Sequence, residues 1–186
     1  MGVDIARGAV NGILLVDKPA GQTSNRTLQD IKKIFKAKKA GHTGNLDLLA
    51  SGLLPVCFGE ATKVSQFLLE SDKLYEAEFT LGKTTSTGDC EGEETSVTGT
   101  SGIDERAINE AIKKLTGDVF QTPPMHSALK VNGKRLYHLA RQGVVVKREN
   151  RQVKIYSFEL MTMNIPKISV RVHCSKGTYI RVLAED

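Results

Sequence analysis

Apolar residues recur along this chain at two spacings, which predict a mixture of helices and strands. Spacings of three and four residues predict a helix that begins at Thr23 or Ser24, a second over residues 60–70, a third that follows Asp104 and a fourth over 134–142. The residues expected to face the core from the first three are Leu28, Ile31 and Phe35; Val64, Phe67 and Leu68; and Ile108, Ala111, Ile112 and Leu115.

Alternation of apolar and polar residues predicts the strands. Residues 75–81 and 167–174 alternate in this way, and strands are also predicted over 12–17, 126–131 and 152–163. Residues 82–103 are rich in Gly, Ser, Thr and acids, which is typical of a loop or a peripheral hairpin. Since strands and helices follow one another without a regular βαβ rhythm, we expect an α+β fold with a mixed, largely antiparallel sheet flanked by helices.

Composition narrows the class of protein. The chain has 186 residues, of which 40% are hydrophobic and 25% charged, as in a globular domain. A formal net charge of +5 fits a polyanionic partner. The scattered residues Cys57, Cys90 and Cys174 indicate reduced thiols in a cytoplasmic protein, with neither a disulfide framework nor a zinc site. No apolar run approaches the ~20 residues that would span a bilayer, so no membrane partner is expected.

Asp47 is the first candidate for chemistry. It lies between two apolar runs in GHTGNLDLLASGLLPV, behind a loop that contains Gly41 and Gly44. A charge in an apolar setting costs several kcal/mol unless it is paired, so a retained carboxylate indicates a use for it. We expect the apolar residues 48–56 to exclude water from this carboxylate. The alternative is that Asp47 caps a helix or forms a turn.

A second candidate group lies near the end of the chain, in KGTYIRVLAED. Tyr179 and Arg181 alternate with their neighbours, so they would share a face of an extended segment, where they could stack on a base and neutralise a carboxylate. A core tyrosine and a surface arginine are the alternative. Tyr75 begins a strand on its apolar face and can equally be a core residue. The four histidines show no metal-ligand spacing.

Five segments carry a resemblance to a known family. They are GILLVDKPAGQTSN, KKAGHTGNLDLLASGLLPVCFGEATK, SDKLYEAEFTLG, TPPMHSALKVNGKRLYHLARQG and HCSKGTYIRVLAED. In this order they resemble the TruB-type tRNA pseudouridine synthases over nearly the whole chain from about residue 11. The GHTG-x-LD and KGTYIR blocks are the most specific.

The resemblance implies an enzyme that isomerises the T-loop uridine at position 55 of tRNA to pseudouridine, without cofactor or metal. It implies that residues 1–186 are the catalytic domain of the pseudouridine synthase fold. We expect this domain to be incomplete at its C-terminus and the family's C-terminal RNA-binding domain to be absent. The expected partner is the T stem-loop of tRNA. We expect a cytoplasmic monomer that needs no protein partner.

The same resemblance assigns roles to individual residues. Asp47 matches the catalytic aspartate, Tyr75 the tyrosine that stacks on the flipped base, Arg181 the arginine that pairs with the aspartate, and Tyr179 a second pocket tyrosine. His42 matches the histidine that enters the T loop in place of the base, and Lys18, Lys63 and Lys130 match basic positions near the RNA. From their sequence context alone, these three lysines would instead face solvent.

One departure from the family pattern concerns the catalytic loop. Leu48 stands where the family usually has proline, which should loosen the loop that aims Asp47. Base flipping would expose the uridine, and Asp47 would attack either C6 of the uracil or C1′ of the ribose. Two other functions stay open: an RNA-binding or RNA-folding module with little catalysis, and a guide-RNA-dependent synthase.

Overall fold

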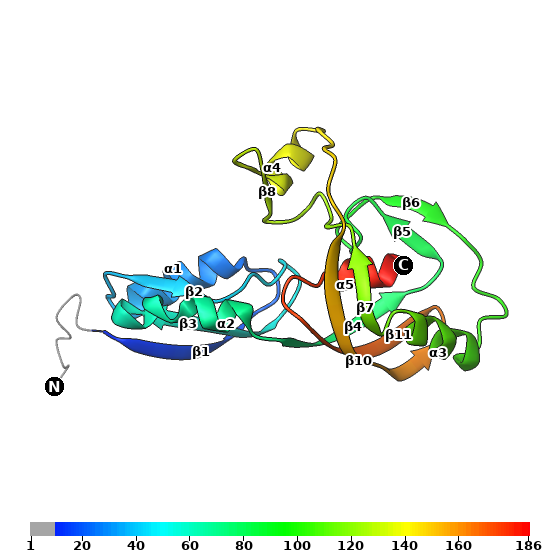
Figure 1. The fold of residues 1–186 in the computed structure, drawn as a ribbon, viewed down its shortest axis with the longest axis horizontal. Helices are drawn as coiled ribbons and strands as arrows, with labels where there is room; N and C mark the ends of the chain where they lie inside the picture. The colour runs from blue at the N-terminus through cyan, green and yellow to red at the C-terminus, as the bar shows by residue number, and fades with distance from the viewer. Residues whose placement is uncertain (1–9) are drawn as a thin grey trace. The chain divides into compact units, whose positions relative to one another are not determined.

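The computed structural model describes residues 10–186, and the chain divides into two compact units with the boundary between Ser71 and Asp72 (Figure 1). We refer to them as unit 1 and unit 2. Each has its own sheet and its own hydrophobic core. No helix within the described residues is long and apolar enough to cross a membrane.

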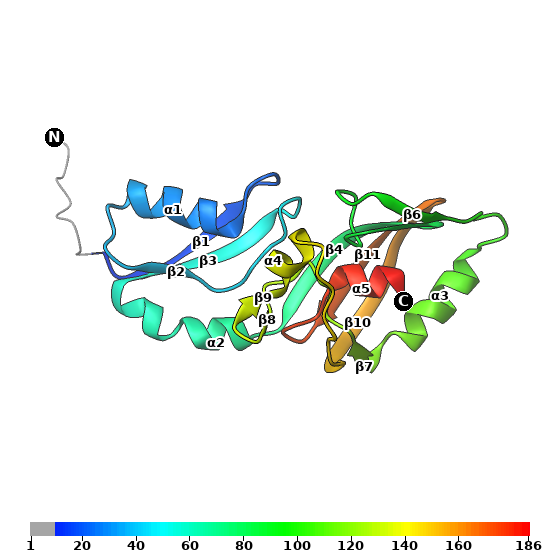
Figure 2. The same ribbon diagram turned by 90° about the horizontal axis from the view of Figure 1, so that it is seen from above.

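Unit 1 is built on a three-stranded antiparallel sheet with the order β1-β3-β2. Its elements are β1 (Gly12–Lys18), α1 (Ser24–Ile34), β2 (Ala40–His42), β3 (Gly52–Phe58), the 3-10 helix η1 (Gly59–Lys63) and α2 (Ser65–Glu70). The helix α1 lies along one face of the sheet, where Leu28 packs with Val56 and Phe58 (Figure 2). Its start is fixed by Thr23, whose hydroxyl accepts from the Arg26 amide at 3.1 Å.

Unit 2 is built on a four-stranded antiparallel sheet with the order β4-β11-β10-β7. Its elements are β4 (Lys73–Thr80), β5 (Lys83–Thr85), β6 (Glu94–Val97), α3 (Glu105–Lys114), β7 (Gly117–Gln121), β8 (Lys130–Val131), β9 (Lys134–Arg135), α4 (Leu136–Arg141), β10 (Arg151–Asn164), β11 (Lys167–Cys174) and α5 (Ile180–Glu185). The β8–β9 hairpin and α4 form a lobe over residues 126–143, drawn in yellow-green in Figure 1.

The core of unit 2 lies between one face of this sheet and the helices α3 and α5 (Figure 2). Along β11, the buried residues Ile168, Val170, Val172 and Cys174 alternate with more exposed ones, as the sequence pattern predicted. Leu183 of α5 and Ile108 of α3 join this cluster. On the opposite face of the sheet, the Arg171 guanidinium binds the Glu76 carboxylate at 2.7 Å. Because only one face of the sheet is buried, apolar and polar residues alternate along its strands.

The α+β class is confirmed, and every ladder within residues 10–186 is antiparallel. Two element predictions are wrong in detail. Residues 60–70 are not one helix, because η1 gives way to α2 at Val64, and Val64 and Phe67 are exposed at 43% and 67% instead of buried. The predicted strand over 126–131 is reduced to Lys130–Val131. The three cysteines are free thiols, as expected.

Candidate active site

Asp47 lies in the loop that joins β2 to β3, and hydrogen bonds hold the chain on both sides of it. Before it, Leu46 exchanges two hydrogen bonds with the Ser24 hydroxyl: its amide donates at 3.0 Å and its carbonyl accepts at 3.2 Å. After it, the Leu48 carbonyl accepts from the Gly21 amide at 2.8 Å. The start of α1 and the loop before it therefore fix the backbone of Asp47.

Lys18, at the end of β1, contributes to the same anchor. Its side chain is completely buried, and its ammonium donates to the carbonyl oxygens of Pro19 (2.9 Å), Gln22 (2.7 Å) and Leu48 (3.5 Å). Burial lowers the pKa of Lys18, and the nearby negative charge of Asp47 raises it by less. The burial shows that the alternative of a solvent-facing Lys18 is wrong, because its ammonium donates to protein oxygens. The RNA contact that the resemblance implies stays a prediction.

His42 ends β2, opposite Val56 of β3, and is half-buried. Burial lowers the pKa of its imidazole, and a backbone hydrogen bond at Gly44 raises it by less. The neutral form is therefore favoured, so His42 offers a neutral ring instead of a cation.

The expectation that residues 48–56 exclude water from Asp47 is wrong for this chain. Asp47 is exposed, and Leu48, Leu49 and Leu53 beside it are exposed at 37%, 43% and 64%. The apolar side chains that do become buried in this segment, such as Val56, belong to β3 and face α1. Lys63, the other basic candidate in unit 1, is exposed on η1 and forms an ion pair with Glu60.

In unit 2, Arg181 is held by three partners from two other segments. Its guanidinium donates to the carbonyl oxygens of Thr87 (2.8 Å) and His126 (2.9 Å), and it lies 3.3 Å from the Asp89 carboxylate. The side chains of Arg181 and Asp89 are only 14% and 23% exposed. Such a half-buried, charge-assisted arrangement fixes the guanidinium more firmly than a surface ion pair.

The loop that carries Asp89 reaches α5 through Gly88. At a φ of +73°, Gly88 adopts a conformation that favours glycine, and a Cβ there would lie 3.0 Å from the Glu185 carboxylate and 3.4 Å from the Arg181 Cβ. Arg181 and His126 also line a hollow of about 390 Å³ in this unit, together with Arg148. The guanidinium therefore borders a space that a ligand group could enter.

Tyr179 immediately precedes α5, and its position is set by Gln121 at the end of β7. The buried Gln121 amide donates to the Tyr179 carbonyl at 3.2 Å and accepts from the Tyr179 amide at 3.0 Å. Arg181 lies inside α5, so the idea that Tyr179 and Arg181 share a face of an extended segment is wrong. Tyr75 of β4 pairs with Val172 and is partly buried against the core of the unit.

Lys130 lies on β8 in the lobe of residues 126–143, where basic and aromatic side chains gather. A hollow of about 480 Å³ in this lobe is lined by Lys130, Gly133, Lys134, Arg135, His138, Leu139 and Gln142. The rings of Tyr137 and His138 lie 4.2 Å apart. The two rings are tilted by 38° and are not stacked on each other. Cations beside aromatic rings can bind phosphates and bases together.

With this geometry in hand, the chain can be compared with known proteins. Residues 32–180 match the family described as TruB family pseudouridylate synthase, N-terminal domain. The chain belongs to this family. The matched range contains Asp47, Tyr75 and Tyr179, and Arg181 is the next residue but one after Tyr179.

Individual relatives support the same family assignment. The chain is 54% identical over 182 residues to the "tRNA pseudouridine synthase B" of Burkholderia mallei (strain NCTC 10247), covering 98% of this chain and 60% of that protein. It is also 54% identical over 177 residues to the protein of the same name from Dechloromonas aromatica (strain RCB), covering 95% of this chain and 59% of the relative. The chain therefore spans about 60% of the length of these curated TruB relatives.

Solved structures of similar fold include that of a Cbf5-Nop10-Gar1 complex, with a TM-score of 0.68 and 33% identity over 93% of this chain and 42% of that one. An H/ACA RNP bound to a substrate RNA containing 2′-deoxyuridine gives a TM-score of 0.65 and 28% identity, over 93% and 40% of the two chains. These neighbours confirm the predicted pseudouridine synthase fold.

Two residues of this TruB chain escaped the sequence reasoning. Asp89 is one of several acids in a polar loop, and nothing in its sequence context singles it out as the partner of Arg181. Gln121 follows an apolar pair in β7 and resembles an ordinary strand end. Only the long-range contacts identify them.

Proposed function

We propose that this chain is the catalytic part of a tRNA pseudouridine synthase that isomerises the uridine at position 55 of the T loop. The observation that carries the proposal is the exposed Asp47, anchored by hydrogen bonds on both sides, in a chain that belongs to the TruB family. The names of the relatives, "tRNA pseudouridine synthase B", support tRNA as the substrate. We expect the protein to act in the cytoplasm as a monomer, without cofactor or metal.

Asp47 is proposed to be the nucleophile. An ionised carboxylate can attack either C6 of the uracil or C1′ of the ribose, and the covalent intermediate divides one difficult isomerisation into easier steps. The uridine must first leave the folded T loop, at a cost of a few kcal/mol. A neutral His42, which we propose to enter the vacated space, offsets part of that cost without placing a buried cation among the bases.

Residues of unit 2 are proposed to complete the chemistry. Tyr75 stacks on the flipped base, Tyr179 lines its pocket, and Arg181 pairs with Asp47. The polar contacts of Arg181 with Thr87, His126 and Asp89 support this role, because they fix the guanidinium before substrate arrives. Lys63 and Lys130 are proposed to contact phosphates, which makes the affinity depend on salt.

The test is tritium release from tRNA that carries [5-³H]uridine, with RNA binding measured in parallel by filter retention. We expect release by the unaltered chain, and none by Asp47→Asn although its RNA affinity stays within about twofold. Asp30→Asn is the matched control, since it removes one carboxylate charge from α1 while preserving its hydrogen-bonding shape. Full release by Asp47→Asn would remove Asp47 from the mechanism.

The same assay separates the alternative functions. Turnover of bare tRNA in the absence of any other protein or RNA would exclude a guide-RNA-dependent synthase. Binding of tRNA without release, even at stoichiometric protein, would instead favour an RNA-binding or RNA-folding module.

A further inference from the structure

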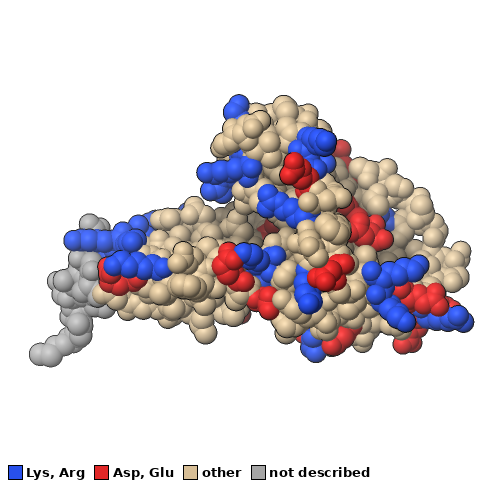
Figure 3. All heavy atoms as spheres, in the orientation of Figure 1, with Lys and Arg blue, Asp and Glu red and all other residues tan. Residues whose placement is uncertain are grey.

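Five lysines crowd the exit of α1, within eight residues of sequence. They are Lys32, Lys33, Lys36, Lys38 and Lys39, and all but Lys32 are exposed. Within residues 10–186, no ion pair joins Lys32, Lys33, Lys38 or Lys39 to a carboxylate. Figure 3 shows Lys and Arg side chains gathered at the end of unit 1 where α1 leads into β2. We call these residues the α1-exit lysines.

The backbone at this exit is tightly specified. The Lys36 amide donates to the Lys33 carbonyl at 3.1 Å, and the Ala37 amide donates to the Lys32 carbonyl at 3.0 Å. These two bonds form a Schellman motif, in which the residue after the C-cap takes the left-handed conformation. Buried Ala37 seals the turn against the core. The motif fixes where the following lysines leave the helix.

Lys36 occupies the position in this motif that glycine usually fills. Its φ is +49°, a conformation that is unfavourable for a residue with a Cβ. A strained residue at a site where glycine would relieve the strain indicates that the side chain itself is used. The helix dipole explains cations in the last turn, and so accounts for Lys32 and Lys33, but its effect does not reach Lys38 and Lys39.

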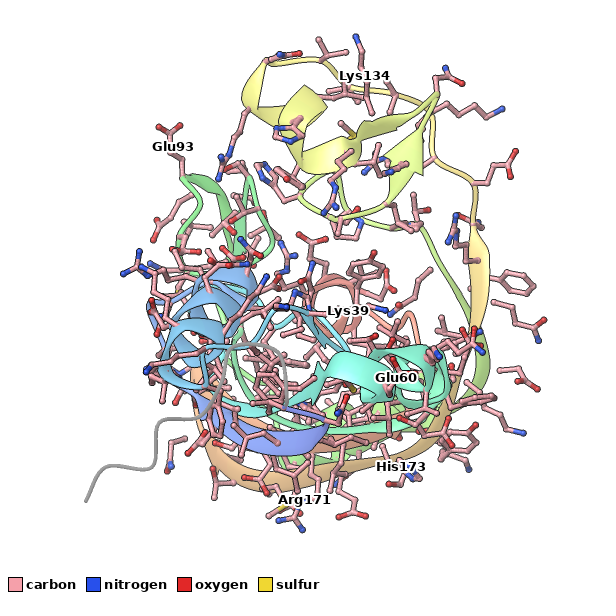
Figure 4. The ribbon with its side chains drawn as sticks, turned by 90° about the vertical axis from the view of Figure 1, so that its left-hand side faces the viewer. Lys39, Glu60, Glu93, Lys134, Arg171 and His173 are labelled. Carbon is pink, nitrogen blue, oxygen red and sulfur yellow. The ribbon has the colours of Figure 1, made fainter. Side chains whose placement is uncertain are left out.

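The cluster is continuous with the strand that carries His42. The Lys39 carbonyl accepts from the Gly59 amide at 2.9 Å, and β2 then runs from Ala40 to His42. Three residues of strand span about 10 Å. Figure 4 views this end of unit 1 and labels Lys39 and Glu60. The Glu60 carboxylate forms an ion pair with Lys63. The lysines therefore lie within a few nucleotides' length of His42.

We propose that the α1-exit lysines bind backbone phosphates of a helical RNA stem, outside the loop that holds the target uridine and without regard to sequence. This inference rests on the proposed function in one respect, that the substrate is RNA. Exposed ammonium groups at adjacent positions suit phosphates spaced along a duplex, and each contact releases a counterion.

The first test compares two double variants with the same loss of charge. Lys38→Gln with Lys39→Gln alters the cluster, and Lys113→Gln with Lys114→Gln alters a matched pair of exposed lysines at the end of α3. Affinity for a T stem-loop RNA is measured by filter binding as a function of salt. For the cluster variant we expect the slope of log K against log salt to fall by about 1.4–1.8. This change in slope means that, relative to its affinity at 1 M salt, the cluster variant gains roughly 25- to 60-fold less affinity at 0.1 M salt than the unaltered chain does. The α3 variant should keep the original slope.

The second test uses the strain at Lys36. Lys36→Gly should raise the Tm by a few degrees, because the left-handed conformation suits glycine, and yet lower the slope by about 0.7–0.9. Lys36→Arg should keep the slope of the unaltered chain. A merely structural role for Lys36 would leave RNA binding unchanged in the glycine variant, or improve it together with the Tm.

The outcomes separate this inference from the proposed function. RNA binding with equal slopes in the cluster and α3 variants overturns the lysine proposal alone, whatever the turnover. Binding of the cluster to anionic vesicles, with the RNA slope unchanged, overturns it in favour of a membrane surface. No RNA binding by the unaltered chain overturns both. A reduced slope in the cluster variant supports the lysine proposal even where tritium release fails.

Discussion

Gln121 is predicted to set the position of the Arg181 side chain through the backbone of Tyr179. The buried amide makes two hydrogen bonds to that one residue, at 3.0 and 3.2 Å. No side chain caps α5, and the two Gln121 bonds help to fix where this short helix begins. Arg181 lies two residues further on, and its contacts require that start to be held in place.

Replacing Gln121 by leucine removes both bonds at similar side-chain volume. The Tyr179 carbonyl keeps its helical donors, Val182 and Leu183, but the Tyr179 amide loses its acceptor. Losing the bond to the Tyr179 carbonyl costs about 1 kcal/mol, and leaving the partly buried Tyr179 amide without this acceptor costs about 1–3 kcal/mol. We therefore expect the free energy of unfolding to fall by roughly 2–4 kcal/mol and the Tm by roughly 5–15 °C.

Replacing Gln121 by glutamate gives a sharper test. The carboxylate still accepts from the Tyr179 amide, but when ionised it faces the Tyr179 carbonyl without a proton to donate. Burial raises the pKa of this introduced carboxyl above the unfolded value of about 4.3. A raised pKa gives stability that is complete below the unfolded pKa and is lost as pH rises through the folded pKa.

Urea unfolding of the unaltered chain and of Gln121→Glu at several pH values between about 5 and 8 measures this effect. The difference in the free energy of unfolding should shrink as pH falls. Gln152→Glu, at an exposed position on β10, should show no such trend. A difference that stays constant with pH, or a Gln121→Leu variant within about 0.5 kcal/mol of the original stability, would refute the bracing role.

Two further predictions concern charge in the candidate site. Asp89→Asn removes the anion beside Arg181 but leaves the Thr87 and His126 carbonyls in place, so the free energy of unfolding should fall by about 1 kcal/mol. We expect tritium release to fall more than RNA affinity does. Equal losses of release and affinity would contradict a role of Asp89 in orienting the guanidinium. Because burial lowers the pKa of His42, the unfolded chain binds more protons below about pH 6.5, and stability should decline as pH falls through the folded pKa. His42→Gln should flatten that part of the stability–pH curve, and an unchanged curve would assign the decline to other groups.

The sequence predicted those parts of the fold in which local chemistry and burial agree. Thr23 and Asp104 cap α1 and α3 as expected, since each side chain accepts from a backbone amide three residues on. The sequence did not predict β3, because Pro55 argues against a central strand. The short β2 pairs only with Val56, Cys57 and Phe58, so Pro55 lies just outside that ladder. Register of this kind depends on a partner strand that local sequence does not reveal.

The prediction of one helix over residues 60–70 was wrong for a different reason. Its apolar spacing predicted a single buried helix, but the Thr62 hydroxyl donates to the Gly59 carbonyl and the Ser65 hydroxyl to the Thr62 carbonyl. Such side-chain bonds favour a tight turn over a continuous α-helix. Apolar spacing is the same whether or not a surface is present to cover it, so it could not predict that Phe67 is exposed.

Leu48 shows why one departure from a family pattern is a weak guide to loop geometry. A proline at a compatible position stabilises a loop by about 0.4–1 kcal/mol, through the unfolded state. In this chain the two Ser24–Leu46 bonds and the Gly21–Leu48 bond each contribute about 1 kcal/mol. Their combined effect of about 3 kcal/mol exceeds what the proline would supply. The orientation of Asp47 is therefore determined mainly by α1 and the loop before it. Substitution of Ser24 should disturb this orientation more than the presence of leucine at position 48 does.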